Sequence, residues 1–119
     1  MRILYIDDLP INGRVMRKIA RTAHCEVMIA ESGKEGLALL AEKPNLILTD
    51  FALPDMDGPL LIRQIRQMLP TIPIIVFTAN GLSTDRQQCL EAGCTDYIAK
   101  PFHFSDMVAY LSRYRETIG

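Results

Sequence analysis

Tryptophan is absent from this sequence of 119 residues, aromatic residues make up 7% of it, and only three of its residues are cysteines. Cys25, Cys89 and Cys94 form no Cys-x-x-Cys motif, and their spacing to His24 and His103 is not that of a zinc site. These absences exclude a disulfide framework and argue against a structural zinc ion. They predict free thiols, buried or half-buried, in a reducing compartment.

Long apolar runs and an excess of charge of either sign are missing as well. No apolar stretch approaches the length of about 18 residues that a membrane-spanning helix needs, and the N-terminus has no signal-peptide pattern. The formal net charge of −1 gives no general attraction to nucleic acid or to an anionic membrane. We therefore expect a soluble, cytoplasmic protein with no membrane contact of its own and no direct contact with nucleic acid.

The sequence does contain a regular alternation of short apolar runs and amphipathic segments. Hydrophobic residues make up 49% and charged residues 23% of the chain, which is typical of one globular domain, here residues 1–119. The apolar runs predict strands at residues 3–6, 27–30, 46–48, 74–77 and 97–99. The spacing of apolar residues between them predicts helices at residues 11–23, 33–42, 58–68, 84–92 and 105–116.

This alternation of five strands with five helices predicts an α/β fold. Strands that are apolar throughout need cover on both faces, so the helices should lie on both sides of a parallel sheet. We expect a flavodoxin-like (βα)5 three-layer sandwich with the strand order 2-1-3-4-5. Ligands of such folds bind beyond the carboxyl ends of the strands, at the point between the first and third strands where the order reverses.

Polar residues stand at the predicted carboxyl ends of four strands. Asp7 and Asp8 follow the first strand, Asp50 ends the third, Thr78 ends the fourth and Lys100 follows the fifth. Because the first and third strands are neighbours in the expected order, the three carboxylates should converge on one crevice. They would repel one another unless a cation lay between them. Oxygen ligands without histidine or cysteine favour a hard ion, here Mg²⁺.

The same residues suit phosphoryl transfer. A carboxylate can act as a nucleophile toward phosphorus and form an aspartyl phosphate when a metal ion offsets the charge of the incoming group. Lys100 and Thr78 would supply a cationic donor and a hydroxyl donor to the oxygens of that group. Four strand ends would thus contribute to one phosphoryl-transfer site.

Two further aspartates follow Asp50 closely but have other expected roles. Asp57 stands before a Gly-Pro pair and is predicted to cap the third helix. Asp55 is predicted to be a solvated loop residue. Ser32 is predicted to cap the second helix, with Glu35 completing a capping box.

Four segments resemble those of two-component response-regulator receiver domains, in order and at family-like spacing. They are ILYIDD, LILTDFALPDMDG, PIIVFTAN and AGCTDYIAKPF, and the resemblance extends from end to end of the chain. It implies a signalling phosphoacceptor domain and not a classical enzyme. In a two-component system or phosphorelay, such a domain takes a phosphoryl group from the phosphohistidine of a histidine kinase or histidine phosphotransfer protein, in a Mg²⁺-dependent reaction.

The resemblance also implies which residues hold the metal ion and accept the phosphoryl group. Asp50 matches the phosphoacceptor. Asp8 and Asp50 match the residues whose side chains bind Mg²⁺, and Asp7 matches a residue that holds the ion mainly through water. The backbone carbonyl of Ala52 matches a further ligand.

The resemblance implies a switching mechanism as well. Thr78 and Lys100 match the residues that hold the phosphoryl group after transfer, and Tyr97 matches the aromatic switch residue. A phosphoryl group on Asp50 would draw Thr78 toward it, and Tyr97 would turn into the vacated space. This would change a protein-interaction surface made by the fourth helix, the fifth strand and the fifth helix. A cis peptide bond is expected between Lys100 and Pro101.

An apolar rim is expected around the acidic crevice, where receiver domains dock the histidine-bearing helix of the donor. Its candidates are Leu9, Pro10, Ile11, Pro101 and Phe102, whereas Val15 is assigned to the core. The segment DDLPIN is similar to receiver domains of hybrid sensor kinases, so a free-standing regulator and a kinase-borne receiver both stay open. The alternative from another functional class is a binding module that works without phosphorylation.

Overall fold

The computed structural model describes residues 1–79 and 83–118, which form a parallel sheet with the strand order β2-β1-β3-β4-β5. The strands are β1 (Arg2–Ile6), β2 (Glu26–Ala30), β3 (Leu46–Asp50), β4 (Ile74–Thr78) and β5 (Asp96–Ala99). All four neighbouring pairs are parallel. The predicted fold class and strand order are therefore confirmed, and the order reverses between β1 and β3.

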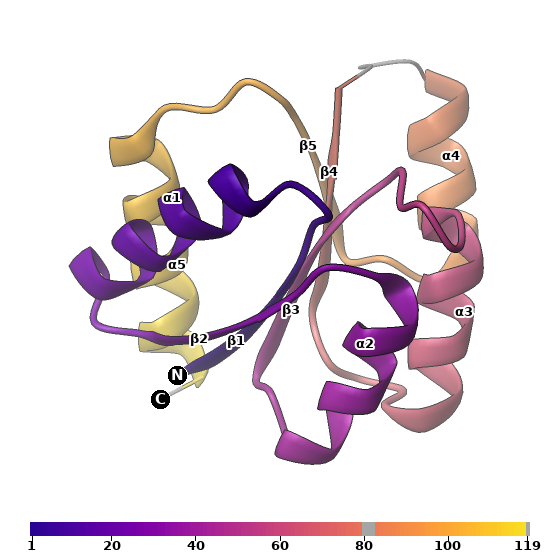
Figure 1. Ribbon diagram of the computed structural model, residues 1–119, viewed down its shortest axis with the longest axis horizontal. Coiled ribbons are helices and arrows are strands. Elements are labelled where there is room, and N and C mark those ends of the chain that lie inside the picture. The colour runs from indigo at the N-terminus through magenta and orange to yellow at the C-terminus, as the bar shows by residue number, and fades with distance from the viewer. Residues whose placement is uncertain (80–82, 119) are drawn as a thin grey trace.

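Helices cover both faces of this sheet. They are α1 (Pro10–Thr22), α2 (Gly33–Ala38), α3 (Gly58–Met68), α4 (Ser83–Ala92) and α5 (Phe104–Ile118). Figure 1 shows α1 and α5 on one face of the sheet and α2, α3 and α4 on the other. This is the three-layer arrangement expected from five strand–helix units with right-handed crossovers.

The sheet separates two apolar cores, and the pleat of β1 contributes to both. Leu4 and Ile6 point into the core beneath α2, α3 and α4, whereas Ile3 and Tyr5 point into the core beneath α1 and α5. All four side chains are buried. Successive residues of a strand face opposite sides, so a strand covered on both faces needs a nearly unbroken apolar run.

The register of the strands brings their carboxyl ends to one edge of the sheet. Ile6 of β1 lies beside Thr49 of β3, and Thr78 of β4 lies beside Ala99 of β5. The residue after Ile6 and the residue after Thr49 are both aspartates. Two carboxylates that are far apart in the sequence are thereby held next to each other by the backbone ladder.

The second helix is shorter than its prediction over residues 33–42. The α-helical part ends at Ala38, and a 3₁₀ turn follows at Leu39–Glu42. Lys43 then adopts a left-handed backbone conformation with φ 56°, which ends the helical segment. Gly36 allows this short helix to approach β1 closely, because a Cβ atom there would lie 2.5 Å from the δ-methyl carbon of a buried isoleucine.

Two of the predicted helix caps are present. The Ser32 hydroxyl accepts the Glu35 N–H at 3.1 Å, and the Asp57 carboxylate accepts the Leu60 N–H at 2.8 Å. The Glu35 carboxylate, however, accepts the N–H of Glu31 at 3.3 Å and not that of Ser32. The capping box therefore has only the half that Ser32 provides.

Asp55 is exposed, as expected of a loop residue, but the prediction that it is merely solvated is wrong. Its two carboxylate oxygens accept the N–H groups of Gly33 and Lys34, each at 2.9 Å. N–H groups in the first turn of a helix have no partner within the helix. Asp55 thus ties the loop after β3 to the start of α2, and these two donors hold the pKa of its carboxyl below the usual range.

The three cysteines are free thiols, as predicted. Cys25 is half-buried, and Cys89 and Cys94 are buried. Over residues 1–79 and 83–118, no helix has both the length and the apolar character needed to cross a membrane.

Replacing Asp55 by asparagine should make the stability of the protein less dependent on pH. A carboxyl whose folded-state pKa is depressed stabilises the fold above its unfolded pKa and loses that contribution as pH falls through the folded pKa. We therefore expect Asp55→Asn to be less stable than wild type at pH 7, with the difference shrinking below about pH 4. Urea denaturation at a series of pH values measures the two unfolding free energies.

Glu116→Gln, at an exposed position on α5, is the matched control and should not reproduce this trend. A stability difference between wild type and Asp55→Asn that stays constant from pH 7 to strongly acidic conditions would contradict the role assigned to Asp55.

Candidate functional site

Carboxylates from two neighbouring strands meet where the strand order reverses. Asp7 and Asp8 follow β1 and Asp50 ends β3, and one carboxylate oxygen from each lies within 4.8 Å of those of the other two. The pairing of β1 with β3 enforces this proximity. The structure thus brings together the three acidic residues that stand at the ends of the first and third predicted strands.

Asp7 is 1% exposed and is held by four donors. Its Oδ1 accepts the Leu9 N–H at 2.9 Å. Its Oδ2 accepts the Tyr5 hydroxyl at 2.8 Å and the Asn12 amide at 3.0 Å, and Lys100 Nζ lies 3.3 Å from the same oxygen. Burial raises the pKa of Asp7, but these donors together outweigh burial and hold the pKa below its usual value. Asp7 is therefore ionised at neutral pH.

Asp50 has a raised pKa, in contrast to Asp7. Burial is the largest cause, and the charges of Asp7 and Asp8 add to it. Lys100, whose Nζ lies 3.7 Å from Asp50 Oδ2, acts in the opposite direction but does not outweigh them. The cluster therefore contains three carboxyl groups and one lysine. The charge of Asp50 is less completely compensated by nearby donors than the charge of Asp7 is.

Lys100 reaches the cluster from the end of β5. Its Nζ lies closer to Asp7 than to Asp50, and its side chain is 23% exposed. The peptide bond between Lys100 and Pro101 is cis, as the family resemblance implied.

Thr78 and Tyr97 lie on the same side of the sheet, near this edge. Thr78 ends β4 and is buried. Tyr97 lies in the edge strand β5 beside Val76, is half-buried, and packs against the core beneath α3 and α4. Val76 belongs to the same core, and Thr78, two residues later in the strand, faces the same side.

The donor set suits a hard divalent cation. The clustered ligand atoms are carboxylate oxygens only, and such oxygens, with carbonyl and water oxygens, are the ligands that Mg²⁺ prefers. Ala52 follows Asp50 by two residues, in a loop that is closed by the β-bridge between Ala52 and Asp57 and by the Phe51 carbonyl, which accepts the Gly58 N–H at 2.8 Å.

Sequence patterns alone do not assign Tyr5 and Asn12 to the site, yet both donate to Asp7. A signal for Tyr5 exists, because residues two apart in an extended segment face the same side, and a buried hydroxyl needs a partner. Burial and the bond to Asp7 raise the pKa of Tyr5 far above its usual value, so its hydroxyl remains a donor. Asn12 lies in the first turn of α1, from which its amide reaches back to the cluster.

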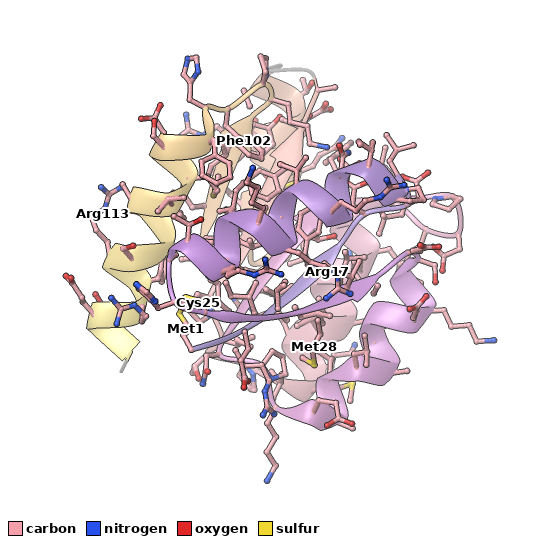
Figure 2. All side chains as sticks on the ribbon, turned by 60° about the vertical axis from the view of Figure 1, so that its left-hand side comes forward. Met1, Arg17, Cys25, Met28, Phe102 and Arg113 are labelled. Atoms are coloured by element: carbon pink, nitrogen blue, oxygen red, sulfur yellow. The ribbon has the colours of Figure 1, made fainter. Side chains whose placement is uncertain are left out.

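An exposed apolar rim borders the cluster on the α1 side. Leu9, Ile11 and Val15 are 52%, 58% and 43% exposed, so the assignment of Val15 to the core is wrong. A small cavity of about 270 Å³ lies between Val15 and the segment of Pro101 and Phe102. Figure 2 shows Phe102 between α1 and α5. The buried face of α1 consists instead of Gly13, Met16, Ile19 and Ala20.

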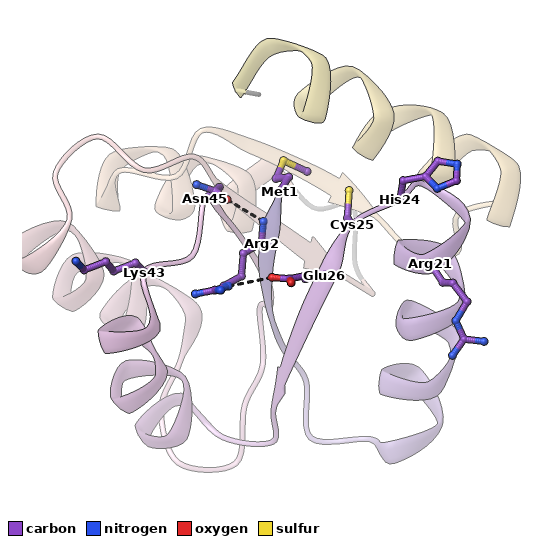
Figure 3. A pocket seen from close by; sticks show the side chains of 8 residues that line it. All are labelled: Met1, Arg2, Arg21, His24, Cys25, Glu26, Lys43 and Asn45. Atoms are coloured by element: carbon purple, nitrogen blue, oxygen red, sulfur yellow. Dashed lines mark hydrogen bonds and ion pairs between the residues drawn. The ribbon is translucent and has the colours of Figure 1, made fainter.

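A polar hollow of about 600 Å³ lies at the opposite end of the sheet (Figure 3). Arg2 in this hollow forms an ion pair with Glu26 at 3.2 Å, and its N–H donates to the Asn45 side chain at 2.8 Å. The side chains of Arg21 and His24 point away from this pair in Figure 3. Because the polar groups do not converge, the acidic cluster remains the candidate functional site.

Comparison with known protein families decides which functional class this cluster belongs to. The profile of the family described as response regulator receiver domain matches residues 3–112. The chain belongs to this family. Receiver domains are signalling phosphoacceptor domains and not classical enzymes, so the resemblance noted in the sequence is confirmed.

Similar proteins include a response regulator and a sensor kinase. This chain is 33% identical over 115 residues to the two-component response regulator ORR5 of Oryza sativa subsp. japonica. The match covers 93% of this chain and 86% of that protein. This chain is 34% identical over 119 residues to the sensor histidine kinase RcsC of Escherichia coli (strain K12). That match covers 99% of this chain but 12% of the kinase.

A similar solved structure holds a metal ion. The receiver domain of sensor histidine kinase PA1611 from Pseudomonas aeruginosa PAO1 is 36% identical, with a TM-score of 0.83 and 95% of each chain covered. In that crystal structure a magnesium ion is coordinated in the active site cleft. The present receiver domain has its own cluster of three carboxylates, Asp7, Asp8 and Asp50, that could hold a metal ion.

Replacing Asp50 by asparagine should stabilise the receiver domain in the absence of metal. A carboxyl with a raised folded-state pKa opposes folding in its ionised form, so its removal stabilises the protein at neutral pH and changes little at low pH. We expect the unfolding free energy to rise by about 1 kcal/mol at pH 7 in the presence of a chelator. Urea denaturation measures this change.

Asp57→Ala, which removes the cap of α3, provides the comparison of opposite sign and should lower the unfolding free energy by about 1 kcal/mol. An Asp50→Asn variant that is less stable than wild type without metal would show that Asp50 is not electrostatically strained.

Proposed function

We propose that this receiver domain, residues 1–119, accepts a phosphoryl group on Asp50 and passes the signal on through a change in a protein-interaction surface. The observation that carries the proposal is the convergence of Asp7, Asp8 and Asp50 within 4.8 Å, with Lys100 at 3.7 Å from Asp50. Compared with Asp7, Asp50 has a raised pKa, and its charge is less completely compensated.

The proposed cofactor is Mg²⁺. Asp8 and Asp50 would bind it through their side chains, Asp7 through water, and Ala52 through its backbone carbonyl. When bound, the ion supplies positive charge that offsets the repulsion between the carboxylates and the incoming phosphoryl group. The magnesium ion in the similar receiver domain of PA1611 supports this choice of metal.

The proposed reaction transfers the phosphoryl group from nitrogen to oxygen. An Asp50 carboxylate oxygen attacks phosphorus, the bond between phosphorus and the histidine nitrogen of the donor breaks, and its electron pair stays with the imidazole. Lys100 would leave Asp7 and bind a phosphoryl oxygen, and the Thr78 hydroxyl would donate to another. The donor is a histidine kinase or a histidine phosphotransfer protein, and the apolar rim of Leu9, Ile11 and Val15 is a surface on which it could dock.

The proposed output is a change in the surface formed by α4, β5 and α5. A phosphoryl group brings a charge of about −2 to Asp50 and draws the Thr78 hydroxyl toward it. Tyr97, on the same side of the sheet as Thr78, would turn into the space that is vacated. Phosphorylation would thereby bias an equilibrium between two arrangements of this surface.

The proposed setting is a cytoplasmic two-component system or phosphorelay, with a downstream protein bound at that surface. The free thiols are consistent with a reducing compartment. A free-standing regulator and a receiver domain within a hybrid sensor kinase would share this chemistry. A module that binds partners without phosphorylation is the alternative from another class, and the test below separates it.

Incubation with Mg²⁺ and a small phosphodonor such as acetyl phosphate should add the mass of one phosphoryl group to the protein. Intact mass spectrometry measures the gain, which should disappear when a chelator replaces Mg²⁺. Asp50→Asn should abolish it, whereas the matched variant Asp55→Asn, in the loop that follows, should retain it. No gain in wild type, or an equal gain in Asp50→Asn, would contradict the proposal.

Lys100→Ala should separate phosphorylation from switching. We expect the variant to accept a phosphoryl group on Asp50 but to lose most of the response on α4 and α5, because the group would lack its cationic partner. Amide chemical shifts of α4 and α5, recorded by NMR with and without phosphodonor, report the response. Lys34→Ala, at an exposed position on α2, is the control. Equal phosphorylation-induced shifts in wild type and Lys100→Ala would count against this role.

A further inference from the structure

Tyr5 lies directly beneath the acidic cluster and is fixed there by packing. It is 1% exposed, and its hydroxyl donates to Asp7 Oδ2 at 2.8 Å. Its ring packs edge-on against Phe77, with ring centroids 6.2 Å apart, and Phe77 packs against Phe102 with centroids 5.2 Å apart. With the ring held in the core in this way, the hydroxyl stays at Asp7 whether or not a cation binds nearby.

The other donors to the same oxygen are more readily lost. Lys100 carries a positive charge that a metal ion would repel, and it lies 3.3 Å from Asp7 Oδ2. Asn12 lies 3.0 Å away on the half-exposed first turn of α1. Among the donors to Oδ2, Tyr5 is therefore the one that packing holds most firmly in place.

We propose that Tyr5 is a positioning residue that weakens Mg²⁺ binding at this site by drawing negative charge from Asp7. A hydrogen bond donated to a carboxylate occupies one of its lone pairs and reduces the charge that it offers to a cation. The effect is strong here because both groups are buried, where electrostatic interactions are less screened than in water. The inference rests on the proposed Mg²⁺ site and adds to it a residue that sets its affinity.

The direction of the effect follows from what remains when the hydroxyl is removed. In Tyr5→Phe, the Leu9 N–H and the Asn12 amide still orient the Asp7 carboxylate. The more negative carboxylate attracts Lys100 more strongly, but a divalent cation carries twice the charge and gains more, even with a water molecule between it and Asp7. Removal of the hydroxyl therefore favours Mg²⁺ over the lysine.

The test is a titration of Mg²⁺ followed by amide chemical shifts in NMR spectra of wild type, Tyr5→Phe, Asp7→Asn and the double variant. Tyr5→Phe should bind Mg²⁺ about five-fold more tightly than wild type, a change that corresponds to the net contribution of one typical hydrogen bond. In the Asp7→Asn background the same replacement should leave the affinity unchanged. Tyr114→Phe, on α5, is the matched control and should bind as wild type does.

Each outcome decides one of the two proposals. If wild type itself shows no Mg²⁺-dependent shifts, the proposed metal site is wrong. If wild type binds Mg²⁺ but Tyr5→Phe binds it equally well or more weakly, the role of Tyr5 is overturned. The same holds if Tyr5→Phe tightens Mg²⁺ binding as much in the Asp7→Asn background as in wild type. Simple damage to the core would not tighten metal binding, so it cannot imitate the expected result.

A second variant keeps the test decisive if Tyr5→Phe does not fold. Asn12→Ala removes the other neutral donor to Asp7 Oδ2 from a half-exposed position. It should also tighten Mg²⁺ binding, because the same oxygen of Asp7 then keeps more of its negative charge. Weaker binding in Asn12→Ala would contradict the idea that donors to this oxygen lower the affinity.

Discussion

Electrostatic repulsion among three carboxyl groups is the constraint on which the functional site depends. The strand ladder forces Asp7, Asp8 and Asp50 together, and Lys100 forms ion pairs with Asp7 and Asp50. The repulsion is compensated to different degrees at Asp7 and at Asp50. Asp7 receives four donors and has a lowered pKa, whereas Asp50 has a raised pKa. One carboxylate is thus a stable anion, and the other is a poorly compensated one that gains from a nearby cation.

The rest of the fold holds these groups in place against their repulsion. Both faces of β1 are packed, so the position of Asp7 at its end is fixed from two sides. The loop after Asp50 is tied to two helices, through the cap that Asp57 gives to α3 and the bonds from Asp55 to the start of α2. Energy from apolar burial and backbone hydrogen bonds therefore offsets the cost of gathering like charges at one edge.

Much of this arrangement was predictable from the sequence, because it depends on the local pattern of apolar and polar residues. The unbroken apolar runs locate the strands, and alternation with helices leaves few topologies open. Once the order 2-1-3-4-5 is accepted, the acidic residues after the first and third strands must meet. The proximity of Asp7 and Asp50 follows from the strand order and needs no knowledge of side-chain packing.

What escaped prediction depends on contacts that no local pattern encodes. The bonds from Asp55 reach Gly33 and Lys34, which precede it by two elements of structure. Val15 belongs to a helix with apolar residues on more than one face, and only packing decides which face is buried. The bond from Tyr5 to Asp7 required knowing that both are buried.

We propose that Asp50 is an electrostatically strained carboxylate whose charge a divalent cation relieves. The direct measurement is the titration of the Asp50 carboxyl carbon by ¹³C NMR, with and without Mg²⁺. We predict a pKa of Asp50 above the usual 3.8 in the metal-free protein and a marked decrease when Mg²⁺ is added. A metal-free pKa at or below the usual value, unchanged by Mg²⁺, would contradict it.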